Sequence, residues 1–252
     1  MNDLISRDVE YAHDGTRMIG ALRAPAGAEG APGVLLLHDA FGLSDDMLAI
    51  AERLARLGYA VLAADVWGER ARPRTQDEIG PLIGAMVADR RRWAARVAAA
   101  HEAAAEQPEV DDDAIVALGY CFGGSSALEH LRTGGAVRGV VSVHPGLDLL
   151  DAEAGWGPCD PTARVLLCTG GDDPMATTEQ RDALQRAMTG AGLDWETDLY
   201  SGTRHAFTSP HARFSPTPEA VAYHPRNAER AWAATTRFLR ELARDLSPAV
   251  VS

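Results

Sequence analysis

The stretch that most constrains the fold is Gly119-Tyr120-Cys121-Phe122-Gly123-Gly124, which joins an apolar run to a helical pattern. The preceding residues 114–118 are all apolar, as in a buried parallel strand, and residues 125–131 have the pattern of a helix. Glycines two positions either side of Cys121 permit a sharp strand-to-helix turn that a larger side chain would obstruct. Helix N–H groups and the helix dipole favour a thiolate at that position. The stretch predicts an α/β fold with a nucleophilic cysteine; the alternative is a structural cysteine buried between glycines.

Two further polar groups follow later strands. The apolar run 165–168 leads to Asp172-Asp173-Pro174, and the alternating segment 195–200 leads to His205. The order nucleophile, acid, histidine is that of the α/β-hydrolase arrangement, so we predict a Cys121-Asp173-His205 triad. Pro174 fixes the exit of its loop, which favours Asp173 over Asp172 as the acid. Asp172 would then be a turn carboxylate that caps backbone N–H groups.

The rest of the chain alternates between strand and helix patterns, which predicts a mostly parallel sheet covered by helices on both faces. We expect residues 1–252 to form a single domain. The expected strands are 4–12, 17–23, 34–37 and 59–64, and the expected helices are 44–58, 82–106, 177–190 and 228–242. The longest loops, 146–163 and 209–225, are expected to line a pocket above the carboxyl edge of the sheet.

Composition narrows the class of protein and its partners. The net charge of −12 argues against a nucleic-acid partner. No apolar segment has the length of a membrane span, and the N-terminal residues do not have the pattern of a signal peptide. The three cysteines, Cys121, Cys159 and Cys168, are an odd number without metal-ligand spacing, which favours free thiols in a reducing cytoplasm. We assign no metal, because His144, His211 and His224 also lack ligand spacing.

Several of these stretches together resemble the dienelactone hydrolase family of α/β hydrolases. They are Gly-Tyr-Cys-Phe-Gly-Gly, Gly-Gly-Asp-Asp-Pro, His-Ala-Phe-Thr, Asp194-Trp195, and the segments 35–42 and 223–228. The resemblance runs from about Met18 to the last helix. It implies an eight-stranded, mostly parallel sheet and a hydrolase without a cofactor that opens lactones or cleaves esters through a cysteine thiolate. It also implies a monomer; a dimer is the alternative.

The chain departs from the family pattern at two positions. Where the resemblance implies a glutamate that holds the resting thiol, this chain has Asp39, which reaches roughly 1.5 Å less far. Asp39 would therefore act through water, or Cys121 would pair with His205, or Asp39 only caps the helix that opens near Ser44. The resemblance also implies an arginine for a substrate carboxylate four residues after the histidine, where this chain has Ser209.

Other groups are candidates for contact with substrate or with the oxyanion. The backbone N–H groups of Phe122 and Ala40 would hold the oxyanion. Arg90 falls in helical register with Met86, Trp93 and Val97, so it is a candidate clamp for a substrate carboxylate; stem packing with the charge in water is the alternative. Phe41 and Phe207 are candidates for the substrate pocket, with core packing as the alternative.

The residues and the resemblance predict a hydrolase that cleaves a lactone or small ester through a thioester acyl-enzyme. A general carboxylesterase or thioesterase of the same fold is the nearest alternative, because specificity depends on the pocket walls. A binding protein without catalysis and a thiol redox protein based on Cys121 are alternatives from other classes.

Overall fold

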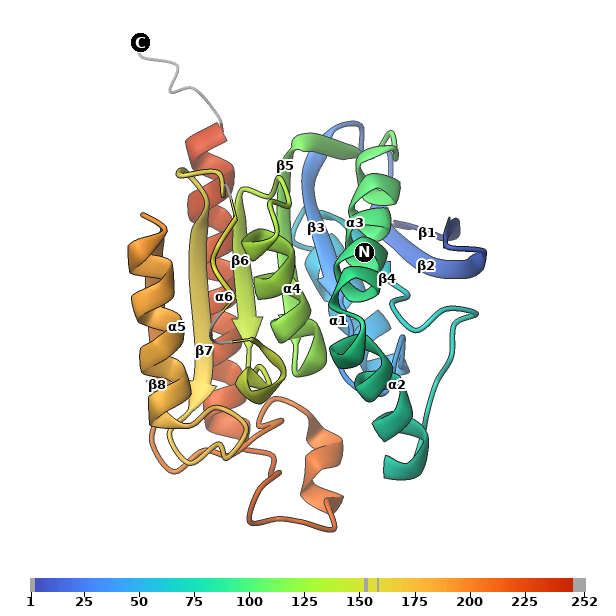
Figure 1. Ribbon diagram of the computed structural model, residues 1–252. Helices are drawn as coiled ribbons and strands as arrows, with labels where there is room; N and C mark the ends of the chain where they lie inside the picture. Colours follow the sequence, from blue (N-terminus) through green and yellow to red (C-terminus); the bar gives the residue numbers. More distant parts are fainter. Residues whose placement is uncertain (1–2, 152–153, 158, 247–252) are drawn as a thin grey trace.

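The computed structural model describes residues 3–151, 154–157 and 159–246. Its strands form one eight-stranded sheet in the order β1-β2-β4-β3-β5-β6-β7-β8 (Figure 1). The strands are β1 Leu4–His13, β2 Thr16–Pro25, β3 Ala31–Leu37, β4 Ala60–Ala64, β5 Val110–Tyr120, β6 Gly139–Val143, β7 Arg164–Gly170 and β8 Asp194–Tyr200. The pairs β1·β2 and β2·β4 are antiparallel and the other neighbours are parallel. The predicted fold class is confirmed.

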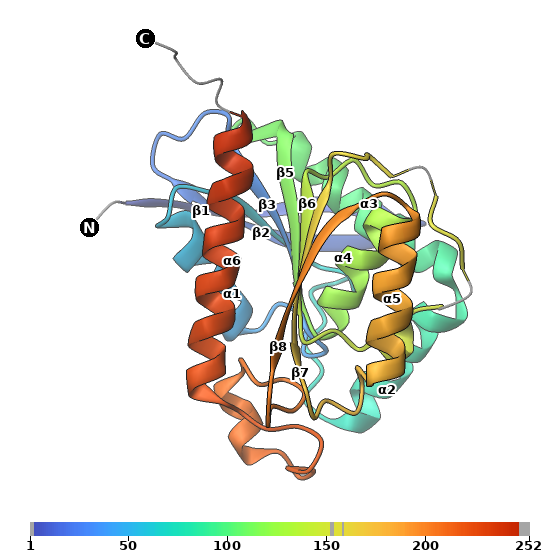
Figure 2. The ribbon, with the colours of Figure 1, turned by 90° about the vertical axis from the view of Figure 1, so that its left-hand side faces the viewer.

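Helices cover both faces of the sheet, as Figure 2 shows. The α-helices are α1 Asp45–Ala55, α2 Gln76–Ala88, α3 Arg90–Ala105, α4 Phe122–Arg132, α5 Thr178–Gly190 and α6 Pro225–Leu246, and the 3-10 helices are η1 Leu147–Leu149 and η2 Pro210–Phe214. Helices α1 and α6 lie on one face, and α2, α3, α4 and α5 lie on the other. Trp93 and Phe122 belong to the core on the α3–α4 side, and Met47 and Phe238 belong to the core on the α1–α6 side. Both faces of the central strands are therefore buried, which explains their continuous apolar runs.

Local signals in the sequence place most of the element ends correctly. Ser44 caps α1 by accepting a hydrogen bond from the Met47 N–H. Thr177 and Gln180 form the capping box at the start of α5, with both of its reciprocal hydrogen bonds present. The turn between β1 and β2 uses Asp14 and Gly15 at positive φ.

The single helix expected over residues 82–106 is wrong, because the chain breaks at Asp89 into α2 and α3. Asp89 has a non-helical backbone (φ −126°, ψ 78°), and its side chain accepts a hydrogen bond from the Arg92 N–H. An aspartate that satisfies an N–H group of the following turn starts a new helix more easily than it continues an old one. The helical register that placed Arg90 with Met86 therefore does not run through this junction.

The parallel strands bring their carboxyl ends to one edge of the sheet, and the segments after β3, β5, β6, β7 and β8 meet there (Figure 1). The loop between β8 and α6, which includes η2, packs over this edge. Its counterpart between β6 and β7 contains residues 152, 153 and 158, which lie outside the described residues. Within the described chain, no helix is both long enough and apolar enough to cross a membrane.

Candidate active site

Cys121 lies at the sharp turn between β5 and α4, as the sequence predicts. Its backbone has a φ of 52°, a left-handed conformation that is uncommon for a residue other than glycine. A methyl group on Gly119 would overlap the backbone of Gly123, and a methyl group on Gly123 would overlap the backbone of Leu37 at the end of β3. The two glycines therefore allow β5, α4 and β3 to approach closely enough to form the turn.

The three residues of the predicted triad meet at this edge of the sheet. His205 Nε2 lies 3.1 Å from Cys121 Sγ, and His205 Nδ1 lies 2.9 Å from Asp173 Oδ2. The other carboxylate oxygen of Asp173 accepts a hydrogen bond from the Met175 N–H at 2.8 Å, which fixes the carboxylate. Asp173 and His205 are both buried, whereas Asp172 is exposed. The contact with His205 is thus made by Asp173, the residue favoured from the sequence.

His205 is a buried imidazole between two acidic groups. Burial opposes its protonation, but the Cys121 sulfur and the Asp173 carboxylate outweigh burial and raise the pKa of His205 to about 10. The arrangement favours an imidazolium at His205 beside the Cys121 sulfur. Of the resting states considered for Cys121, the contact with His205 is the one whose geometry is present.

Asp39 is positioned by the segment after β3. His38 Nε2 accepts a hydrogen bond from the Val66 N–H at 3.1 Å, so His38 Nδ1 carries the proton and donates it to the Asp39 carbonyl at 2.6 Å. The Asp39 carboxylate accepts a hydrogen bond from the Phe41 N–H at 2.9 Å, so it forms a local turn and does not cap α1. Burial raises the pKa of Asp39 to about 6.

His144 is the residue that the sequence analysis missed, because we considered it only as a metal ligand. It follows β6, has a φ of 38°, and lies edge-on to His205 with a 5.4 Å separation of ring centroids. Its Nε2 lies 2.7 Å from Thr208 Oγ1. Burial holds the pKa of His144 well below its ordinary value, and the neighbouring His205 lowers it further. The Val143-His144-Pro145 sequence directly after a buried strand was the available signal.

A cavity of about 360 Å³ opens beside Cys121. Its wall includes Asp39, Ala40 and Phe41 after β3, His144 after β6, and residues 206, 208–212, 214–217 and 221 of the β8–α6 loop. The loop 209–225 therefore lines a pocket, as predicted. Phe41 lies in this wall, but Phe207 is fully buried beneath it, with its ring against His144 and Tyr200. Core packing, the alternative stated for Phe207, is the observed role.

Arg90 does not reach the cavity beside Cys121. It starts α3, and its guanidinium donates a hydrogen bond to the Leu149 carbonyl at 2.9 Å and lies 4.0 Å from the Glu129 carboxylate. Arg90 keeps its spacing to Trp93 within α3, and α3 lies on the opposite face of the sheet from α1, whose residues line the cavity.

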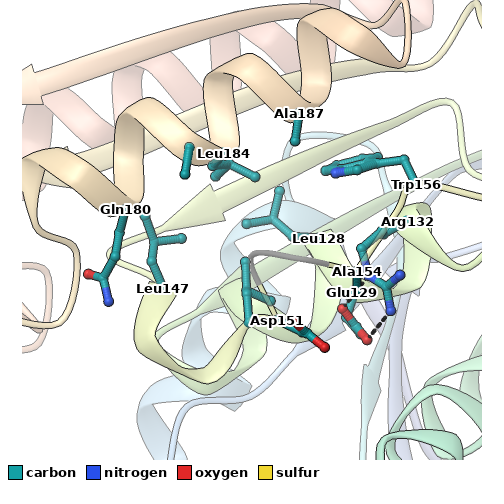
Figure 3. Close-up of a pocket in the computed structure, with 12 residues that line it drawn as sticks. Leu128, Glu129, Arg132, Leu147, Asp151, Ala154, Trp156, Gln180, Leu184 and Ala187 are labelled. Atoms are coloured by element: carbon teal, nitrogen blue, oxygen red, sulfur yellow. Dashed lines mark hydrogen bonds and ion pairs between the residues drawn. The ribbon is translucent and has the colours of Figure 1, made fainter.

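A separate, mostly apolar hollow lies between α4 and α5 (Figure 3). Leu128, Leu147, Leu184 and Trp156 contribute to its wall, and Glu129 forms an ion pair with Arg132 at its edge. Within the described chain, the group of acidic residues close enough to share a metal ion is Asp111, Asp112 and Asp113. That group lies near the start of β5, whereas Cys121 follows the end of the same strand.

Comparisons with known proteins identify the family of this chain. A model of the dienelactone hydrolase family matches residues 18–243. The "Probable 2-oxo-3-(5-oxofuran-2-ylidene)propanoate lactonase" of Bradyrhizobium sp is 26% identical over 239 residues, which cover 92% of each chain. The solved structure of the dienelactone hydrolase-like promiscuous phosphotriesterase P91, from metagenomic libraries, is 34% identical with a TM-score of 0.87 and covers 95% of this chain and 98% of its own.

A more distant solved structure, esterase 2 of Thermogutta terrifontis, is 17% identical with a TM-score of 0.65 over 94% of both chains, and it shares the fold. The family match covers far more than half of the chain and includes Cys121, Asp173 and His205. The chain therefore belongs to the dienelactone hydrolase family and is a carboxylic ester or lactone hydrolase.

Proposed function

We propose that this protein hydrolyses small esters or lactones by acyl transfer to Cys121. The observation that carries the proposal is the continuous contact from Cys121 Sγ through His205 to Asp173, with distances of 3.1 Å and 2.9 Å. A nucleophile held against a base that is itself oriented by a buried acid is the arrangement that covalent acyl transfer requires.

The first half of the reaction forms a thioester. The Cys121 thiolate attacks the carbonyl carbon, a C–S bond forms, and the carbonyl oxygen becomes an oxyanion. The N–H of Phe122, the first residue of α4, has no partner within its helix and would donate to that oxygen together with the Ala40 N–H at the cavity wall. The C–O bond then breaks, and the His205 imidazolium gives its proton to the leaving oxygen.

The second half of the reaction regenerates the enzyme. Water attacks the thioester carbon while His205 accepts one of its protons, and the C–S bond breaks to release the acid. His205 and the sulfur return to their starting contact. The sum is one ester bond cleaved and one water consumed, with no oxidant or reductant.

A second candidate activity is hydrolysis of phosphotriesters. The observation that favours it is the 34% identity, over nearly the whole of both chains, to a structure described as a promiscuous phosphotriesterase. Thiolate attack at phosphorus would use the same Cys121, so an aryl phosphotriester belongs in the substrate panel beside p-nitrophenyl acetate, an aliphatic lactone and a carboxylated dienelactone.

The test of the proposed function is this panel with the wild type and with Cys121→Ala. We expect kcat/KM of the variant to fall at least about 10³-fold for every substrate that the wild type turns over, since only binding and the oxyanion donors remain. Circular dichroism of the variant checks that the fold is retained. Undiminished hydrolysis by a folded Cys121→Ala protein would contradict the mechanism.

A further inference from the structure

The charged groups in the wall of the cavity beside Cys121 are acidic. Asp39 and Asp46 line the cavity together with the imidazoles of His144 and His211. Among the described residues of this wall there is no arginine and no lysine. His211 Nε2 lies 3.4 Å from Asp46 Oδ2. A bound carboxylate would still meet two carboxylates in this wall, with no guanidinium or ammonium to pair with it.

A further aspartate lies near the predicted triad. The charged groups that act on the Asp39 carboxyl are Asp46, His205 and His211. Asp148, after β6, lies close enough to interact with both His205 and Asp173. His205 contacts both the Cys121 sulfur and the Asp173 carboxylate. The buried Arg181 of α5 donates to the Gly170 carbonyl at the end of β7 and to the Ala176 carbonyl, and it does not line the described part of the cavity wall.

Three arginines on the elements around the cavity have other partners. Arg53 lines an adjoining hollow, but its guanidinium lies 3.7 Å over the Trp232 ring and shares that wall with Glu229. Arg72 pairs with Asp45 at 2.8 Å on the outer side of α1. Arg213 donates to the Pro210 carbonyl and lies 5.3 Å over the Tyr223 ring. None of these side chains lines the described part of the cavity wall.

Most of the remaining wall is apolar. Phe41 and Phe214 are exposed at 45% and 79%, and Met47, Ile50 and Val221 complete an uncharged lining. Binding of an apolar group to this apolar surface is favourable, because it removes apolar area from water. Binding of an ion there is unfavourable, because the ion must lose its hydration shell.

We propose that the site takes uncharged, largely apolar esters and excludes esters that carry a carboxylate near the reacting carbonyl, with Asp46 as a residue that determines this specificity. The inference rests on the proposed function, because it concerns the substrate class of the same site. In this proposal the Asp46 carboxylate repels a substrate carboxylate from the cavity wall and takes no part in the bond-breaking steps.

Turnover of two matched esters tests the specificity. The p-nitrophenyl ester of valeric acid and the mono-p-nitrophenyl ester of glutaric acid have the same acyl chain length and differ at its end, which is a methyl group or a carboxylate. We expect the wild type to favour the uncharged ester at least about tenfold in kcat/KM at low ionic strength, because like charges in a partly desolvated cavity repel. Equal or faster hydrolysis of the glutarate ester would overturn the proposal.

A charge-removing substitution tests the role of Asp46. In Asp46→Asn, we expect the ratio of kcat/KM between the two esters to fall about threefold to tenfold. The matched control is Asp45→Asn, which removes the neighbouring carboxylate of the same helix turn; Asp45 is exposed, pairs with Arg72 and does not line the cavity. Equal shifts in both variants would mean that only the overall charge of the protein matters.

A third measurement does not depend on turnover and so separates this inference from the proposed function. Iodoacetamide and iodoacetate are nearly isosteric, and their alkylation of Cys121 can be followed by peptide mass spectrometry. We expect the rate ratio of iodoacetamide to iodoacetate at Cys121 to exceed the ratio for free mercaptoethanol about fivefold, and to fall toward it in Asp46→Asn. A ratio equal to or below that of mercaptoethanol would overturn the inference even if hydrolysis through Cys121 holds.

Discussion

Two pairs of neighbouring histidines show how differently the same side chain behaves in this molecule. At the carboxyl edge of the sheet, His205 lies against His144 and contacts both Cys121 and Asp173. Between α3 and α4, His101 Nδ1 lies 2.9 Å from His130 Nε2. Burial and, to a smaller extent, the neighbouring His101 lower the pKa of His130 to about 3, whereas the pKa of His205 is raised to about 10. Burial alone therefore keeps an imidazole neutral, and the acidic neighbours of His205 are what make it a proton carrier.

Removing the carboxylate that contacts His205 should have the largest effect on activity. Asp173→Asn keeps the size of the side chain but removes the charge that supports the His205 imidazolium. We expect kcat/KM for p-nitrophenyl acetate to fall about 10³- to 10⁴-fold, and the alkaline limb of its pH profile to move to lower pH as the pKa of His205 falls. Asp172→Asn is the matched control, since Asp172 is exposed and should change kcat/KM by less than about twofold. Equal losses in the two variants would contradict the assignment of Asp173.

The pair of His101 and His130 should make the free energy of unfolding depend on pH under acidic conditions. A histidine whose folded pKa lies below its unfolded value contributes full stability above about pH 6.5, and this contribution is lost as the pH falls toward the folded value, about 3 for His130. His130→Gln removes this titration and should flatten the pH dependence of the unfolding free energy by about 1 kcal/mol per pH unit between those limits. Urea unfolding at a series of pH values measures this slope, and an unchanged slope would mean that His130 is not held neutral by burial.

The opposite sign is expected for His205. The raised pKa of His205 means that its stabilising contacts are fully present below about pH 6.5 and are lost as the pH rises through about 10. Unfolding measured in alkali should therefore show a loss of stability that Asp173→Asn reduces.

The smallest effect on activity is expected from a change beside His144, the ring next to His205. Thr208→Val removes the hydroxyl that lies 2.7 Å from His144 Nε2 and leaves a buried ring nitrogen without its partner. We expect kcat/KM to fall about threefold to tenfold, because the His144 ring that borders His205 is then less firmly held. Thr208→Ser retains the hydroxyl and should restore most of the activity; failure of serine to do so would argue that the methyl group matters instead.

Local sequence signals were enough to predict most of the fold and the residues around Cys121. The glycines beside Cys121, the apolar central strands and the capping residues Ser44 and Thr177 act over a few residues, so they can be read directly from the sequence. The order of Cys121, Asp173 and His205 along the chain was informative because parallel strands bring their carboxyl ends together.

The features that the sequence did not reveal depend on contacts between distant segments. Arg90 appeared to face the site when its helix was read as continuous, but Asp89 begins a new helix, and the Arg90 guanidinium donates to the Leu149 carbonyl on the other face of the sheet from α1. The contact of His144 with His205 joins segments 61 residues apart along the chain, and no local pattern encodes it. The acidic character of the cavity likewise arises only when Asp39 and Asp46 meet the β8–α6 loop.

Trapping of the acyl-enzyme tests the central claim most directly. The wild-type protein would be mixed with p-nitrophenyl acetate, quenched in acid within the first turnovers, digested and analysed by mass spectrometry. The account predicts one acetyl group on the peptide that contains Cys121, bound as a thioester that hydroxylamine removes, and no such adduct in Cys121→Ala. An acetyl group on another residue in an actively turning-over enzyme, together with an unmodified Cys121, would contradict it.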